Sequence, residues 1–338
     1  MEEQTTPIIT PHIYESYKDP DAHVHTVQEA LNQSLDELME WQNRSHPIGI
    51  PSGFPSLDKM TEGWVAGELI VIAGKPYTGK TTLALNMAAY AAIEAFIPTM
   101  IISFSETETQ IARRLAISIS SVSSHKLHGG AKLEDYEWVS LEDSLKKLAK
   151  APLLIDSSCR LTTDDIGAKI QKYTREQGVC LVIIDDFQSI STPVDYAGNK
   201  EAEMTNISLE LKRIAREQEV TIITIARLSR GSTKAYDRSS SQKPQLAELK
   251  DTSSLEYDAD RIIFVHPRDF LGMSDYPEDR DKVTLILAKN RTGETGEIDL
   301  LFKKEQGKFI EADSPLDLSS RTFISSAANN PDFDNSDF

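Results

Sequence analysis

The segment GKPYTGKT at residues 74–81 restricts the folds open to this chain more than any other part of the sequence. It matches the pattern G-x-x-x-x-G-K-[ST] and lies between an apolar run, ELIVIAG (68–74), and a helical pattern that starts at residue 81. Glycines at both ends of such a loop let the backbone curl so that consecutive N–H groups point inward, and the following helix adds partial positive charge. The strand–loop–helix context therefore predicts a phosphate-binding loop (P-loop) rather than a simple glycine turn.

The side chains of this loop suit the charges of a nucleoside triphosphate. Lys80 is placed to neutralise the β- and γ-phosphates, Thr81 offers a hydroxyl to Mg²⁺, and Thr82 can contact the α-phosphate. ATP and Mg²⁺ are therefore the expected cofactors. The expected nucleotide-binding residues are Gly74, Lys75, Pro76, Tyr77, Thr78, Gly79, Lys80, Thr81 and Thr82.

Apolar runs alternate with helical patterns from about residue 48 to residue 311, which predicts an α/β domain. The near-continuous valine, isoleucine and leucine of these runs indicates a mostly parallel sheet flanked by helices. The expected strands are 68–74, 99–105, 152–158, 181–186, 221–226, 261–266 and 283–291, followed by a hairpin over 297–311 that turns at Gln306-Gly307. The expected helices are 81–95, 109–122, 163–177 and 201–218.

The strand expected over 181–186, LVIIDD, ends in two carboxylates. An acidic residue at the end of a buried strand reaches Mg²⁺ in P-loop proteins, directly or through water. Adjacent side chains of a strand point to opposite faces, so one of Asp185 and Asp186 is expected to face the phosphates. We favour Asp185, which with Thr81 forms the expected metal site, and Asp186 is the alternative.

Hydrolysis also needs a carboxylate that orients the attacking water. Glu106 and Glu108 follow the strand expected over 99–105, and either could serve. The alternative is that both are surface residues, attracted by the dipole of the helix that begins there.

The segments outside the α/β domain differ in composition. Residues 1–24 are polar and proline-containing and are expected to be flexible. Residues 25–44 carry an apolar stripe at helical spacing, followed by a breaker-rich link, so a linker helix over 25–47 either folds back on its own domain or docks on a neighbouring subunit. Residues 312–338 are rich in Ser, Asp and Asn and are expected to form a disordered acidic tail.

The overall composition is that of a cytoplasmic protein. No apolar run approaches the roughly 18 residues needed to cross a bilayer, so no membrane partner is expected. The two cysteines, Cys159 and Cys180, have no metal-ligand spacing, which predicts neither zinc nor a disulfide. The net charge of −17 argues against a surface that is basic all over, but allows a narrow basic channel.

Taken together, these segments resemble the RecA-like motor domain of the DnaB-type hexameric replicative helicases. The resemblance covers about residues 48–311. It rests on the P-loop and on the segment IIDDFQ, in which Gln188 stands at the family's Gln. The further segments that carry it are IGIPSGFPSLDKMTEGW, ELKDTSSLEYDAD (248–260), AKNRTGETG (288–296) and LLFKKEQGKF.

The resemblance implies a site that is shared between subunits. Arg291 stands at the position of an arginine finger that reaches the neighbour's γ-phosphate, and Lys289 is its companion. With Glu106, Lys80 and Asp185 they make the expected catalytic set. Arg227 replaces the family's usual Gln after the strand TIITIA and is expected to contact phosphate.

The resemblance also implies a homo-hexamer with single-stranded DNA in a central channel. The expected contact segments are 191–203 and the cationic stretch after strand 221–226, although the latter could instead be a plain surface loop. The expected DNA-binding residues are Lys200, Arg230, Lys234, Arg238, Lys243, Lys250, Asp251 and Ser253.

Besides Arg227, two further departures from the family pattern affect the expectations. Ungapped alignment puts Ser105 at the position of the catalytic glutamate, and Glu106 would then lie on the other face of an ideal strand. Only about 47 residues precede the motor domain, which indicates a short phage-like or divergent form without the family's N-terminal collar, in which the helix over 25–47 is the linker helix that docks on the neighbour.

The expected activity is that of an ATP-dependent 5′→3′ DNA helicase of replication, in the cytoplasm or, for a phage-encoded chain, the host cytoplasm. The alternatives are a non-unwinding RecA-like ATPase, such as a helicase loader or filament former, and a replication scaffold with weak hydrolysis. The ending PDFDNSDF combines carboxylates with two phenylalanines, which suits docking on a polymerase, primase or other replication protein, or simply a solubilising tail.

Overall fold

The computed structural model describes residues 26–32, 35, 49–120, 122–127, 131–228, 243–269 and 279–311, without the side chains of 250–253. The chain divides into two units, Met1–Ile48 and Gly49–Phe338. In the first unit residues 27–32 and 35 are helical, and Thr26 caps them: its hydroxyl accepts from the N–H of Glu29 (3.2 Å) and its own N–H donates to the Glu29 carboxylate (2.8 Å). The rest of the expected linker helix, segment 1–24 and tail 312–338 lie outside the described residues.

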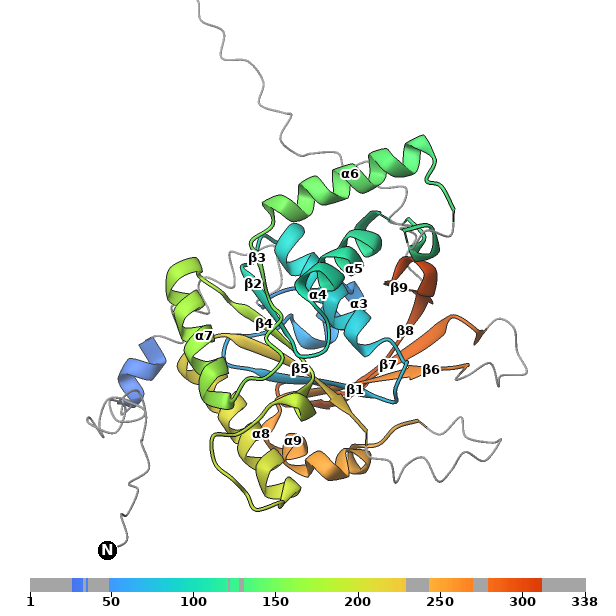
Figure 1. Ribbon diagram of the computed structural model, residues 1–338. Coiled ribbons are helices and arrows are strands. Elements are labelled where there is room, and N and C mark those ends of the chain that lie inside the picture. Colours follow the sequence, from blue (N-terminus) through green and yellow to red (C-terminus); the bar gives the residue numbers. More distant parts are fainter. Residues whose placement is uncertain are drawn as a thin grey trace, which may run out of the picture. The chain divides into compact units, whose positions relative to one another are not determined.

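A sheet of nine strands lies at the centre of the described part of the second unit, in the order β3-β2-β4-β5-β1-β6-β7-β8-β9 (Figure 1). Strands β1 to β6 run parallel, and β7, β8 and β9 are antiparallel. The mostly parallel sheet predicted from the apolar runs is therefore confirmed. The strands are β1 (Leu69–Gly74), β2 (Thr99–Ser103), β3 (Leu153–Asp156), β4 (Leu181–Asp185), β5 (Thr221–Arg227), β6 (Arg261–Pro267), β7 (Lys282–Asn290), β8 (Gly296–Lys303) and β9 (Lys308–Glu311).

Helices cover both faces of this sheet, as Figure 1 shows. Alternate residues of β1 enter different cores: Ile70 and Ile72 pack on one side, while Leu69, Val71 and Ala73 pack on the other. The first core is closed by α3 (Pro55–Thr61), α4 (Lys80–Ile93), α5 (Glu108–Ser120) and α6 (Asp135–Lys150). The second is closed by α7 (Thr163–Gln177), α8 (Lys200–Glu217) and α9 (Ser253–Asp258), and short 3-10 turns lie at η2 (Phe187–Ser189), η4 (Leu246–Thr252) and η6 (Lys304–Gln306). No helix in the described ranges is long and apolar enough to span a bilayer.

The sheet has two edges at which strands end, and they carry different residues. Because β1, β2, β4 and β5 are parallel, their carboxyl ends meet at one edge, which we call the carboxyl edge. The opposite, amino edge holds the starts of β1 and β6. It also holds the end of β7, because β7 runs antiparallel to β6 and pairs Asn290 with Arg261.

Candidate active site

The loop between β1 and α4 has the geometry of a phosphate cradle. Gly79 caps α4 with φ of 92°, and a Cβ there would lie 2.8 Å from the ring of Phe309. A Cβ on Gly74 would meet the Thr78 hydroxyl and a backbone carbonyl, each at 2.9 Å. A side chain at either position would therefore clash with its neighbours, and the positive φ of Gly79 also favours glycine. The loop places the first N–H groups of α4 where an anion can bind.

The Lys80 side chain is buried and folds over this loop. Its Nζ donates to the carbonyl oxygens of Gly74 (2.9 Å) and Lys75 (2.7 Å). Burial lowers the pKa of Lys80 to about 8, and Asp185 opposes this shift. An ammonium held by neutral carbonyls in a buried place is poorly compensated, so a phosphate group would be a better partner.

The two adjacent carboxylates after β4 face different partners. The hydroxyl of Thr81 donates to Asp185 Oδ2 (2.8 Å), whereas Asp186 is ion-paired with Arg227. Burial raises the pKa of Asp185, and the nearby charges of Asp186 and Glu106 add to the rise. A divalent cation beside Asp185 would favour its charged form. This arrangement supports Asp185 over Asp186 as the metal ligand.

Arg227 ends β5 beside the P-loop, in register with Gly74. Its backbone is held by Gln188 in a reciprocal pair: the Gln188 amide donates to the Arg227 carbonyl (3.1 Å) and accepts from the Arg227 N–H (3.2 Å). The main chain of Arg227 is therefore fixed, while its guanidinium is more than half exposed. An exposed guanidinium at this edge can exchange Asp186 for a phosphate oxygen.

Glu106 lies closer to the P-loop than strand alternation predicts. Strand β2 ends at Ser103 and the chain bends over residues 104–106, so the alternation that would have pointed Glu106 away no longer applies. Glu106 lines the same small cavity as Thr81 and Asp185. Arg114 of α5 is ion-paired with Glu106 and also donates to the Thr82 hydroxyl (2.8 Å).

The other two candidates for orienting water point elsewhere. Glu108 accepts a hydrogen bond from the hydroxyl of Ser157 (2.6 Å), which follows β3. Ser105 is exposed. Of the three residues, Glu106 has the position best suited to a water near the γ-phosphate.

The donor set fits a magnesium–nucleotide complex rather than a bare metal ion. In the described part of the chain, no group of three or more His, Cys, Asp or Glu side chains could hold a metal. Mg²⁺ usually takes one or two protein oxygens and completes its octahedron with phosphate and water oxygens. Thr81 and Asp185 would supply such oxygens, and Lys80 with the loop N–H groups would hold the phosphates.

The expected finger lies at the amino edge of the sheet, away from the P-loop of its own chain. Arg291 Nη1 donates to Asp260 Oδ1 (3.0 Å), and the backbone N–H of Arg291 donates to the Asp260 carbonyl (3.0 Å). Lys289 donates to the carbonyls of Glu256 (2.7 Å) and Tyr257 (3.1 Å) in the last turn of α9. Burial lowers the pKa of Lys289, and neighbouring Arg291 lowers it further.

Only part of the expected DNA-binding set can be placed. Lys200 begins α8 and pairs with Glu203 (2.9 Å), and Lys243 pairs with Glu297 (2.6 Å). Both lysines are more than half exposed, so these pairs are weak and open to exchange. Outside the described residues, or without described side chains, are Arg230, Lys234, Arg238, Lys250, Asp251 and Ser253.

Two residues of the site were missed by the sequence analysis. Arg114 joins Glu106 to the P-loop helix, and only its helical spacing from the glutamates could have drawn attention to it. Asp260 holds Arg291, and the signal was an acidic residue directly before an apolar strand in the segment EYDAD.

Comparison with known proteins gives consistent matches. Residues 49–311 match the family model for the DnaB-like helicase C terminal domain. The chain is 30% identical over 292 residues to the replicative DNA helicase DnaC of Bacillus subtilis (strain 168), and 31% identical over 292 residues to the replicative DNA helicase DnaB of Geobacillus stearothermophilus. Each alignment covers 86% of this chain and 63% of the relative, so the chain spans less than two thirds of the length of these relatives.

Solved structures agree with these sequence matches. One of them, described as an ATPase domain, superposes with a TM-score of 0.77 at 27% identity, covering 85% of this chain and 98% of that one. A DnaB-like replicative helicase, described with its interactions with primase, superposes with a TM-score of 0.74 at 26% identity, covering 88% and 70%. The chain belongs to the family of DnaB-like helicase C-terminal domains, with the RecA-like fold expected from its sequence.

Proposed function

We propose that this protein is an ATP-dependent DNA helicase that forms a homo-hexameric ring, moves 5′→3′ on single-stranded DNA and separates strands during replication. The observation that carries the proposal is the position of Arg291. It lies at the amino edge, while the P-loop lies at the carboxyl edge, with the six residues of β1 between them. At roughly 3.3 Å per residue that separation is about 20 Å, too far for one chain to complete its own site.

In the proposed site, each residue has one task. Lys80 and the N–H groups of the P-loop bind the phosphates, and Thr81 and Asp185 hold Mg²⁺, which neutralises phosphate charge when bound. Glu106, kept in place by Arg114, orients the attacking water. Arg291 of the neighbouring subunit, with Lys289 beside it, stabilises the charge that grows on the transferred phosphoryl group.

Coupling to DNA would begin at Arg227. The segments that follow β4 and β5 both leave the carboxyl edge, and Arg227 stands at the end of β5. We propose that Arg227 exchanges Asp186 for phosphate when ATP binds, and that this exchange shifts the contacts of Lys200, Lys243 and their neighbours with the DNA backbone.

Exposed apolar side chains on two helices support assembly through the linker helix. Val27, Leu31 and Leu35 are more than half exposed. On α6, Trp138 and Leu145 are seven residues apart, which places them on one face of the helix, and both side chains are exposed. Large exposed apolar patches are typical of binding surfaces. We propose that the helix of one subunit docks on α6 of the next.

Partners and location follow from the same proposal. The tail over 312–338 would recruit a polymerase, primase or other replication protein, and the protein would work in the cytoplasm. One solved relative is described with its interactions with primase, which supports a contact of this kind.

The test is unwinding of a forked duplex with a 5′ tail, measured with Mg-ATP together with DNA-stimulated ATPase and the oligomeric state by sedimentation. We expect strand separation by a hexamer, and loss of the hexamer in Leu31→Asp. ATP turnover on DNA without strand separation, or an open filament, would instead favour a RecA-like loader or filament former. Nucleotide binding without turnover would favour the scaffold.

A further inference from the structure

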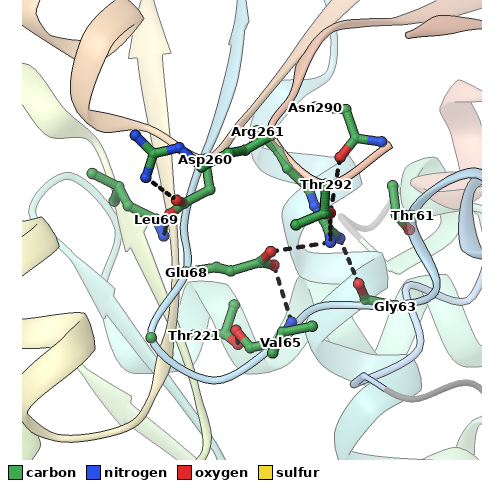
Figure 2. Close-up of polar contacts among 12 residues, drawn as sticks. Thr61, Gly63, Val65, Glu68, Leu69, Thr221, Asp260, Arg261, Asn290 and Thr292 are labelled. Atoms are coloured by element: carbon green, nitrogen blue, oxygen red, sulfur yellow. Dashed lines mark hydrogen bonds and ion pairs between the residues drawn. The ribbon is translucent and has the colours of Figure 1, made fainter. Parts of the chain in front are cut away.

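Asp260 is a buried carboxylate at the amino edge that joins several elements, and Figure 2 shows its surroundings. Its Oδ2 accepts from Lys212 Nζ of α8 (2.5 Å) and from the N–H of Leu69 at the start of β1 (2.8 Å). Its Oδ1 accepts from Arg291 Nη1 (3.0 Å). Its side chain is 6% exposed, while that of Arg291 is 56% exposed. A buried acceptor therefore holds a cation whose side chain is largely exposed.

The charges of this cluster show that Arg291 is not needed to neutralise Asp260. Lys212 already provides one positive charge, and the Leu69 N–H provides a further hydrogen bond. A protein is strongly destabilised when a buried carboxylate loses its only partner. Asp260 would keep two donors, Lys212 and the Leu69 N–H, if Arg291 moved. The contact with Arg291 is therefore available for a purpose other than stability.

The geometry suits orientation of the guanidinium. The backbone N–H of Arg291 donates to the Asp260 carbonyl and its Nη1 donates to the Asp260 carboxylate, so one residue fixes both ends of the arginine side chain. A guanidinium has five N–H donors in a planar fork, and a contact through Nη1 leaves others for a phosphate. A freely rotating arginine would first have to lose rotamer entropy before it could bind a phosphate in one orientation.

The same carboxylate ties the finger to the subunit's own nucleotide strand. The N–H and carbonyl of Leu69 pair with the Asp260 side chain and backbone N–H, each at 2.8 Å, and β1 runs from Leu69 directly into the P-loop. The finger offered to one neighbour and the loop that serves the subunit itself are thus fixed to opposite ends of one strand.

We propose that Asp260 is the positioning residue of the arginine finger: it holds Arg291 so that the guanidinium reaches the nucleotide of the adjacent subunit in an orientation ready for the transition state. This inference rests on the proposed function, because it requires that Arg291 act in trans. Asp260 itself touches neither ATP nor DNA.

The test compares Asp260→Asn with the wild type in the hexamer without DNA. We expect kcat to fall about 10- to 100-fold with the KM for ATP within about twofold, because misplacement of a catalytic group by about 1 Å has effects of this size. Asp260→Glu, which keeps the charge, should recover part of the rate. Glu68→Gln is the matched control: it breaks the adjacent buried ion pair with Arg261 (3.0 Å), which does not involve Arg291, and should leave kcat near wild type.

Subunit mixing separates a misplaced finger from a damaged fold. Asp260→Asn subunits mixed with Lys80→Ala subunits should turn over ATP faster than the mean of the pure variants, since intact P-loops then meet intact fingers. If Asp260→Asn is unstable by thermal melting, Asp260→Asn/Lys212→Met removes both charges of this ion pair and should show the same loss and the same recovery. An unchanged or raised kcat, or no recovery on mixing, overturns the positioning role.

A reference mixture of Arg291→Ala with Lys80→Ala distinguishes the two levels of the argument. Recovery there, without recovery for Asp260→Asn, overturns only the role of Asp260. Absence of recovery in the reference mixture overturns the trans finger, and with it this inference.

Discussion

The carboxyl and amino edges of the sheet make an instructive comparison, because both carry arginines and carboxylates but are organised differently. At the carboxyl edge, Lys80, Asp185 and Glu106 surround a loop that is built for a ligand. At the amino edge, Asp260 and its cations form a closed network of protein groups, from which Arg291 projects. In the proposed site, the carboxyl edge binds the nucleotide of its own subunit, and Arg291 of the amino edge would act on that of a neighbouring subunit.

The difference also shows in how the groups are charged. At the carboxyl edge, burial lowers the pKa of Lys80 and raises that of Asp185, so it disfavours the charged form of both side chains. A bound magnesium–nucleotide complex would favour the charged forms. At the amino edge, the buried Asp260 is satisfied by three donors. Substitutions at the two edges should therefore affect nucleotide binding and ATP turnover to different degrees.

The largest effect is expected at the carboxyl edge, for Lys80→Ala. Removal of the loop side chain that is placed to neutralise the β- and γ-phosphates should reduce ATP turnover to background and weaken nucleotide binding. A fluorescent ATP analogue and a phosphate-release assay measure the two effects. Turnover close to that of wild type would show that the loop does not have the assigned role.

Arg291→Ala should have the next largest effect, at the amino edge. We expect kcat to fall about 10³-fold, the low end of the range for arginine fingers, with binding of the ATP analogue nearly unchanged. The same assays apply, and Arg268→Ala, at an exposed ion pair with Asp299, is a matched control that should keep its rate. If binding of the ATP analogue fell in parallel with turnover, Arg291 would also be needed for nucleotide binding, which would contradict the proposed division of roles between the two edges.

Glu106→Gln tests which carboxylate orients the attacking water, because the sequence left the choice between Glu106 and Glu108 open. Removal of the carboxylate that orients water should lower kcat about 10²-fold with little change in binding. The controls are Ser105→Ala and Glu108→Gln, which should stay within about twofold of wild type because neither side chain lines the cavity of Asp185 and Thr81. If Glu108→Gln were the slow variant, the assignment would pass to that residue.

A smaller effect is expected from pH, through Lys80. Its pKa of about 8 in the nucleotide-free protein lies below the ordinary 10.5, so the unfolded chain binds more protons between these values and the contribution of Lys80 to folding stability rises with pH in that window. Phosphate favours the charged form, so ATP binding takes up a proton above pH 8. We expect affinity to fall about 20-fold from pH 7.5 to 9.5 in calorimetry.

Lys80→Arg is the control for this titration, because a guanidinium keeps its charge throughout. Its affinity should stay level over the same range. Equal pH dependence in both proteins would assign the effect to another group.

The sequence predicted the carboxyl edge well because its signals are local. Six parallel strands and the P-loop could be located from runs of apolar residues and one short motif, and the strand ends differ by at most two residues from those expected. The helix α6 was not among the expected helices, although its reciprocal cap between Glu134 and Glu137 is a local signal that could have revealed it.

The rest depended on contacts between distant residues. Strand alternation alone could not place Glu106, because β2 ends at Ser103 and the chain bends before Glu106. Asp260 accepts from Leu69, 191 positions away in the sequence, and from Lys212, 48 positions away. Pairings of this length follow from the strand order of the sheet, which no local pattern gives.

The central claim is that each ATP site is completed by two subunits, and the ATPase rate of mixed hexamers tests it most directly. Lys80→Ala and Arg291→Ala are each expected to be inactive alone, but a mixed ring contains sites that join the P-loop of one variant to the finger of the other. We expect rates well above the weighted mean of the pure variants at intermediate ratios. Rates that stay at that mean, in hexamers shown to contain both variants, would contradict it.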